Sequence, residues 1–143
     1  ERAGFMRSER MVQLTEEYGA ETCIGWLHGK GGFVSLLGTN DLREVERMIA
    51  AGNEEALLYE RAMAYQLAKC ICSLLPAAEG RVDALILTGG GAYWERLTGD
   101  VQSRLAFTGI PVYRMPGENE MQALAEGAVR VMRGEEAVQQ YEG

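Results

Sequence analysis

The segment from Val82 to Tyr93 combines an apolar run with three consecutive glycines, and its residue types point to ligand binding. The run 82–87 is rich in leucine and β-branched residues, which is typical of a strand buried on both faces of a sheet. Thr88-Gly89-Gly90-Gly91 follows, and a helical pattern begins directly afterwards. A strand, a glycine turn and a helix leave free backbone N–H groups at the carboxyl edge of a parallel sheet. Nucleotides and phosphates bind at such edges, so the segment predicts a nucleotide site.

The glycine turn matches neither of the two familiar phosphate-binding motifs. A P-loop requires Lys-Ser or Lys-Thr after its last glycine, and neither follows Gly91. The dinucleotide motif requires glycine where Trp94 stands. Trp94 shares a helical face with Leu97, Val101 and Leu105, so it either fills the core or stacks on a base. Tight strand–helix packing would also explain the glycines, and both interpretations stay open.

Two other segments could hold a ligand or a metal. Gly29-Lys30-Gly31-Gly32 could cradle a phosphate, with Lys30 as the cation, or form a plain surface turn. We interpret His28, the only histidine, as structural, because no serine or cysteine nucleophile pattern lies nearby. Glu118 and Glu120 begin a helix, where the helix dipole favours carboxylates. A glutamate facing the same cleft as the glycines could instead hold Mg²⁺ through water.

Hydrophobic periodicity predicts an α/β fold with at least three mainly parallel strands flanked by helices. Strands are expected at 33–37, 82–87 and 110–115, and helices at 9–19, 21–27, 42–51, 53–75, 94–105, 120–133 and 135–141. Thr39-Asn40-Asp41 supplies N-cap residues for the helix at 42–51. Three strands are few for a chain of 143 residues. Either further strands lie near the start, or part of the sheet lies outside this chain.

The helix expected from Asn53 to Leu75 is apolar around most of its circumference, and Pro76 ends it. Such a helix requires partners on more than one side. It is therefore either a central core helix or a contact surface for a second subunit or a further domain.

Composition limits the class of partner. The net charge of −7 would repel the phosphates of nucleic acid, and no apolar run approaches the roughly 18 residues that a membrane span requires. Three cysteines and one histidine favour reduced thiols over a zinc site, which predicts a cytoplasmic protein. No linker divides the chain, which begins with Glu1. We therefore expect residues 1–143 to form a single domain of a longer polypeptide.

The order of these segments resembles the carboxyl-terminal half of butyrate kinase, a member of the acetate kinase and sugar kinase–actin–chaperone superfamily. The similarity covers the chain from about residue 29 onwards. The matching segments are 29–32, 37–46, 62–69, 82–93, 116–121 and 123–128.

This resemblance implies an incomplete ribonuclease H-like (actin-like ATPase) domain, the carboxyl-terminal nucleotide-binding part of a larger two-domain kinase. The implied reaction is reversible phosphoryl transfer from ATP to the carboxylate of a short-chain fatty acid, giving an acyl phosphate and ADP. The resemblance also implies Mg²⁺ as cofactor and a homodimer formed through this half. The pocket for the short-chain carboxylate would lie outside this chain.

The resemblance assigns roles residue by residue. Thr88-Gly89-Gly90-Gly91 is similar to the family's adenosine motif, and Asp41-Leu42-Arg43 matches a segment that lines the adenosine pocket in acetate kinases. Glu120 matches the glutamate associated with magnesium, and Arg2 resembles an active-site arginine that supports the transferring phosphoryl group. Arginine and magnesium suit this chemistry, because positioning and charge neutralisation account for most phosphoryl-transfer catalysis.

Two alternatives stay open. The chain could be a truncated, non-catalytic module that dimerises and holds no nucleotide. It could also belong to a kinase for acetate, propionate or a branched-chain acid. Butyrate is favoured because Gly38-Thr39-Asn40-Asp41 and Gly117-Glu118-Asn119-Glu120 resemble that branch more than the acetate branch.

Overall fold

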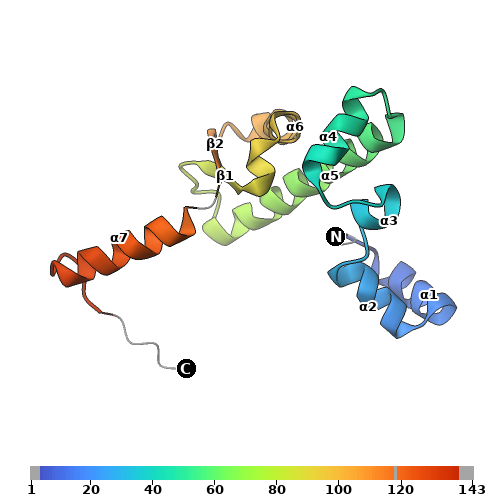
Figure 1. Cartoon of the computed structure of the whole chain (residues 1–143), viewed down its shortest axis with the longest axis horizontal. Helices are drawn as coiled ribbons and strands as arrows, with labels where there is room; N and C mark the ends of the chain where they lie inside the picture. The colour runs from blue at the N-terminus through green and yellow to red at the C-terminus, as the bar shows by residue number, and fades with distance from the viewer. Residues whose placement is uncertain (1–3, 118, 139–143) are drawn as a thin grey trace.

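The structure is a computed structural model of the chain and describes residues 4–117 and 119–138. Helices precede a single βαβ unit, and a last helix follows it (Figure 1). The first helices are α1 (Ser8–Tyr18), α2 (Ala20–His28), α3 (Phe33–Leu37), α4 (Leu42–Ala50) and α5 (Glu54–Leu74). After them come β1 (Leu85–Gly89), α6 (Glu95–Leu105), β2 (Val112–Pro116) and α7 (Glu120–Met132). Short 3₁₀ helices η1 (Leu75–Ala78), η2 (Gly90–Tyr93) and η3 (Ala106–Thr108) join these elements.

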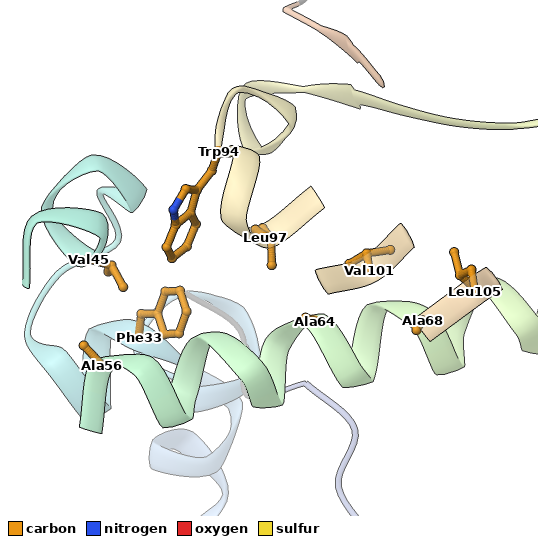
Figure 2. Close-up of a cluster of buried hydrophobic side chains, with 9 residues drawn as sticks. All are labelled: Phe33, Val45, Ala56, Ala64, Ala68, Trp94, Leu97, Val101 and Leu105. Carbon is orange, nitrogen blue, oxygen red and sulfur yellow. The ribbon is translucent and has the colours of Figure 1, made fainter. Parts of the chain in front are cut away.

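The core forms where α6 packs along α5 (Figure 2). The buried face of α5 presents small alanines at positions 56, 64 and 68, with Glu60 at the turn between the first two. Large side chains of α6 lie over them, because Leu97, Val101 and Leu105 repeat at helical spacing and are buried. Phe33 of α3 and Val45 of α4 close the same cluster at its other end. The long helix is not covered around its whole circumference, because Leu58, Tyr65 and Leu74 remain exposed.

Strands β1 and β2 form a parallel pair in which Leu85 faces Val112 and Gly89 faces Pro116. Helix α6 makes the crossover between them. One face of the pair, with Leu85, Leu87 and Val112, packs on the core. The other face exposes Ile86, Tyr113 and Met115. The prediction that the first strand is buried on both faces is therefore wrong for the described residues, because no helix covers this second face.

Helix α7 extends away from the core (Figure 1) and contributes no buried residue. Its apolar side chains Met121, Leu124 and Met132 are exposed, and Val129 is partly exposed. The sequence prediction placed this apolar face against a sheet. The described residues supply no such contact, although the helix itself is confirmed with a boundary one residue shorter.

The expected α/β class with parallel strands is confirmed, but the number of strands is not. The described residues contain two strands instead of three, because Phe33–Leu37 is the helix α3. Gly32 and Gly38, both with positive φ, bracket these five residues. A helix satisfies its own backbone hydrogen bonds, whereas a strand here would need a partner strand that the described residues do not provide.

The terminal helix expected at 135–141 is also corrected as far as residue 138. Gly134 has φ +72, and the N–H of Glu135 donates to the carbonyl of Arg130 at 2.9 Å. This reversal ends α7, and residues 135–138 are not helical. Residues 139–141 lie outside the described part of the chain.

The structure bears on the predictions about a membrane span and about the cysteines. No helix among the described residues is long and apolar enough to cross a membrane. All three thiols are free, with Cys23 buried and Cys70 and Cys72 half-buried.

Glu60 interrupts the alanine face of α5 with a carboxylate that is only 1 % exposed. Its Oε1 atom has no hydrogen-bond partner among the described residues. Burial raises the pKa of Glu60, repulsion from Asp100 raises it further, and the nearby arginines 96, 61 and 104 oppose these two effects. The folded protein therefore binds a proton at Glu60 more tightly than the unfolded chain does.

We predict that Glu60→Gln raises the thermal midpoint at pH 7 and leaves it nearly unchanged at pH 4. A raised folded-state pKa gives stability that is present below the unfolded value of 4.5 and is lost as the pH rises through the folded value. The neutral amide does not titrate, so the gap between variant and parent should widen with pH. Thermal melts at several pH values measure this gap. A gap that stays constant with pH would contradict the prediction, and Glu46→Gln, on the exposed face of α4, is the control.

Candidate functional site

The carboxyl ends of β1 and β2 are joined by contacts that involve Thr88, Gly89 and Gly117. The N–H of Gly89 donates to the carbonyl of Gly117 at 3.3 Å, and the N–H of Gly117 donates to the carbonyl of Gly89 at 3.2 Å. The Thr88 hydroxyl also donates to the Gly117 carbonyl at 3.2 Å. These contacts bring the glycine turn beside the loop that leads into α7, which places two of the predicted segments at one edge of the sheet.

Glycine is required at position 89 for conformational reasons, but not at the two positions that follow. Gly89 has φ +77, a conformation that L side chains rarely adopt. Gly90 and Gly91 lie in η2 with ordinary φ values. A methyl group added at Gly90 would meet no atom within 4 Å, and one at Gly91 would meet only Leu42 Cδ1, at 3.8 Å. The fold therefore leaves open backbone above these two residues, as close approach by a ligand would need.

Asp41 begins α4 and is held in place by its own neighbours. Its carboxylate accepts the backbone N–H of Arg43 at 2.9 Å, which caps the helix. The Arg43 guanidinium donates to both carboxylate oxygens, with Nε–Oδ1 at 2.9 Å and Nη2–Oδ2 at 2.7 Å. These hydrogen bonds lower the pKa of Asp41 to about 2. Asp41 is therefore ionised throughout the neutral range and already paired, while the other face of Arg43 is open to solvent.

Leu42 links the two segments that the family resemblance assigned to adenosine. Its Cδ1 atom lies 3.8 Å from the position of a methyl group on Gly91, so the first residue of α4 contacts the glycine turn. Asp41 and Arg43 flank this contact at the amino end of α4. The structure thus brings the 41–43 segment and the 88–91 segment together, although nearly fifty residues separate them in sequence.

Tyr93 is a residue of this region that sequence reasoning did not select. Its side chain is 67 % exposed, and its hydroxyl oxygen lies 2.8 Å from the position of a methyl group on Gly117. Gly117 also has φ +99, so its backbone conformation favours glycine there. The Tyr93 ring therefore spans the gap between η2 and the loop after β2. A tyrosine closing a glycine turn was the available signal, but only the fold shows what it touches.

Trp94 fills the core, which decides between the two interpretations of that residue. The side chain is 3 % exposed, and Figure 2 shows the indole between Val45, Phe33 and Leu97. Its Nε1–H has no acceptor among the described residues. Trp94 therefore packs on the core side of the glycine turn and does not cover Gly90.

The remaining predicted residues are more scattered. Glu120 is exposed in the first turn of α7, three residues after Gly117. No cluster of three or more metal-ligating side chains occurs among residues 4–117 and 119–138. Glu120 thus suits Mg²⁺ only as a single carboxylate working with nucleotide phosphates and water, which is a common arrangement for this ion. Arg2 and Glu118 lie outside the described residues. Lys30 lies on an exposed turn, where its N–H donates to the Gly25 carbonyl at 2.8 Å.

The geometry of Asp41 predicts how the amino end of α4 responds to substitution. Asp41→Ala removes the cap and the ion pair and should lower the thermal midpoint, whereas Asp41→Asn keeps an N-cap acceptor and should lower it less. Because the folded-state pKa is depressed, the contribution of the carboxylate is present above pH 4 and is lost as the pH falls towards 2. Melts at pH 7 and pH 3 test both statements. Equal midpoints for the two variants at pH 7 would contradict the capping role, and Asp83→Ala, at an exposed position, is the control.

Solved structures similar to this chain share one enzyme class in their names. A propionate kinase from Francisella tularensis subsp. tularensis SCHU S4 is 26 % identical, with a TM-score of 0.64 over 74 % of this chain and 28 % of its own. Acetate kinase from Porphyromonas gingivalis is 24 % identical, with a TM-score of 0.72 over 90 % of this chain and 39 % of its own. Acetate kinase from Entamoeba histolytica is 17 % identical, with a TM-score of 0.74 over 92 % and 41 %.

These likenesses establish the fold as part of the acetate kinase, actin-like ATPase architecture. The chain spans 28 to 41 % of the length of the structures it matches. The sequence itself matches the Acetokinase family over residues 10–133, which is most of the chain. The chain with its parallel βαβ unit and glycine turn therefore belongs to the Acetokinase family.

Proposed function

We propose that this chain is the carboxyl-terminal nucleotide-binding part of a two-domain kinase that transfers a phosphoryl group between ATP and a short-chain carboxylate. The single observation that best supports the proposal is the meeting of Leu42, the glycine turn and Gly117 at the carboxyl edge of β1 and β2. Ligands of open α/β sheets bind at this edge. Membership of the Acetokinase family supports phosphoryl transfer to a carboxylate as the reaction of this site.

In this proposal the base and ribose of the nucleotide lie over Gly90 and Gly91, with Leu42 as an apolar wall. Gly90 offers bare backbone and Leu42 a methyl surface, which together suit the flat, partly apolar adenosine. Asp41 holds Arg43 by two hydrogen bonds, so the guanidinium is positioned before a ligand arrives. Hydrogen bonds to Gly117 fix the positions of Thr88 and Gly89, where the glycine turn begins.

The phosphoryl-transfer end of the site is proposed from the family resemblance. Glu120 would hold Mg²⁺ through water, and it begins α7 close to the Gly117 link. Arg2 would neutralise charge on the transferring phosphoryl group. The acyl pocket would belong to the part of the enzyme outside this chain.

The exposed apolar surfaces support the proposal that this chain is an incomplete domain. β1 has one strand neighbour among the described residues, so its other edge offers unpaired backbone groups. Ile86, Tyr113 and Met115 cover the free sheet face, and α7 exposes its own apolar side. An apolar run such as 82–87 suits a parallel strand covered on both faces, so the missing cover would come from the remainder of the two-domain protein.

Butyrate is the acid we propose, because the 38–41 and 117–120 segments resemble the butyrate branch. Acetate and propionate are the alternative acids, since the similar structures are named acetate and propionate kinases. An assay of the full-length enzyme with each acid would decide between them. Acyl phosphate formed faster from acetate or propionate than from butyrate would overturn the butyrate assignment.

Nucleotide binding by this chain is the first test of the proposed function. Titration calorimetry with MgADP should show binding, and Gly90→Leu should weaken it by about tenfold or more, because the side chain would occupy the open space over the turn. Gly90 has an ordinary φ and no neighbour within 4 Å of the added carbon, so the fold should tolerate leucine.

Gly99→Leu is the matched control for that titration. Gly99 lies on α6, also has an ordinary φ and also has no neighbour within 4 Å of an added carbon. MgADP affinity should be unchanged in this variant. If a folded parent chain shows no heat with millimolar MgADP, the nucleotide proposal fails and the non-catalytic module becomes the better account.

We propose that the chain forms a homodimer through α5. The alternative of a non-catalytic module also expects this dimer. The side of α5 away from Ala56 and Ala64 exposes Leu58 and Tyr65, which lie two helical turns apart and leave an apolar surface open to a partner. Multi-angle light scattering should give twice the chain mass, and Leu58→Glu should shift it towards the monomer. A monomeric parent chain would contradict the dimer while leaving the nucleotide site untouched.

A further inference from the structure

A second concave site lies between α5 and α6 and has no role in the proposed reaction. Its volume is about 420 Å³, which is within the range of small-molecule pockets. Its lining includes Glu60, Arg61, Arg96, Gly99, Asp100 and Ser103. None of these residues belongs to the predicted nucleotide site.

One oxygen of the buried Glu60 carboxylate lacks a donor. Glu60 is 1 % exposed, lines this pocket, and has no hydrogen bond to Oε1 within the described residues. An unsatisfied buried acceptor costs about 1–3 kcal/mol, so a bound N–H or O–H donor would recover a favourable interaction. Asp100 adds a second carboxylate, held by Arg104 at 3.5 Å.

Two arginines of the same pocket form no ion pair at contact distance. Arg61 and Arg96 are exposed at its lining, and neither forms an ion pair with another described residue. Glu95, which also lines the pocket, is engaged by Arg114 of β2 at 2.9 Å and is therefore already paired. A ligand could thus meet an unpaired acceptor and two unpaired guanidinium groups within one cavity.

The mixture of carboxylates and guanidinium groups in this pocket disfavours a simple ion as its ligand. The described residues include no cluster of three metal-ligating side chains, and the guanidinium groups would repel a metal cation. A phosphate or sulfate would suit the arginines but would face the carboxylates of Glu60 and Asp100. A water molecule would give Glu60 a donor but would leave both arginines without an anion.

We propose that this pocket binds a small zwitterion, a free α-amino acid, with its ammonium group towards Glu60 and Asp100 and its carboxylate towards Arg61 and Arg96. Each charge of the ligand then meets the opposite charge on the protein, and the Glu60 acceptor gains its donor. Ser103 adds a hydroxyl at the lining, and Gly99 leaves room for the ligand. The site is separate from the glycine turn and does not depend on the proposed kinase activity.

Titration calorimetry of this chain with each of the common α-amino acids tests the proposal. At least one should bind, and Glu60→Gln and Arg96→Gln should each weaken it by about tenfold or more. Glu60→Gln should at the same time raise the thermal midpoint of the free protein at pH 7, because it removes a buried charge. A purely structural role for Glu60 would raise the midpoint in the same way but leave the affinity unchanged, so the affinity distinguishes the two roles.

Gly99→Leu and Gly90→Leu separate this site from the nucleotide site. Gly99→Leu should abolish amino-acid binding and spare MgADP, and Gly90→Leu should do the reverse. Arg10→Gln, on the exposed α1, should change neither. Absence of binding by every amino acid at millimolar concentration would overturn the proposal, as would unchanged affinity in Glu60→Gln. Neither result would bear on the MgADP experiment.

Discussion

The packing of large α6 side chains onto the alanines of α5 is the constraint on which the rest of the fold depends. Alanine at 64 and 68 lets the two helices approach closely, and Leu105 and Val101 fill the space between them. α6 is the crossover between the two strands, so fixing it on α5 also fixes the sheet. Trp94 extends the same contact to α4 and places the glycine turn above the core.

The predicted nucleotide site follows from that arrangement. β1 and β2 end at the same edge because they are parallel, and the Gly89–Gly117 hydrogen bonds hold their ends together. α4 reaches this edge because Val45 is packed into the core cluster, which brings Leu42 onto Gly91. The pocket around Glu60 lies between the same two helices that make the core, so the Glu60 carboxyl group is buried by that packing.

Much of this could be predicted from local sequence, and the failures have physical reasons. The long helix and both strands were found because apolar spacing is strong over those lengths, and Pro76 marked the end of the helix. Phe33–Leu37 was misassigned because five apolar residues do not distinguish a helix from a strand. The Tyr93–Gly117 and Leu42–Gly91 contacts join distant segments, so no local pattern could reveal them. The family resemblance had assigned the 41–43 and 88–91 segments separately to the adenosine pocket, and that assignment stays a prediction.

Hydrogen–deuterium exchange of this chain with and without MgADP tests the central claim most directly, because it reports which backbone amides the nucleotide covers. The account predicts slower exchange in the peptides that contain Gly89–Tyr93 and the first turn of α4, with little change in α1 and α2. Protection confined to other helices, or no change at saturating MgADP, would contradict it.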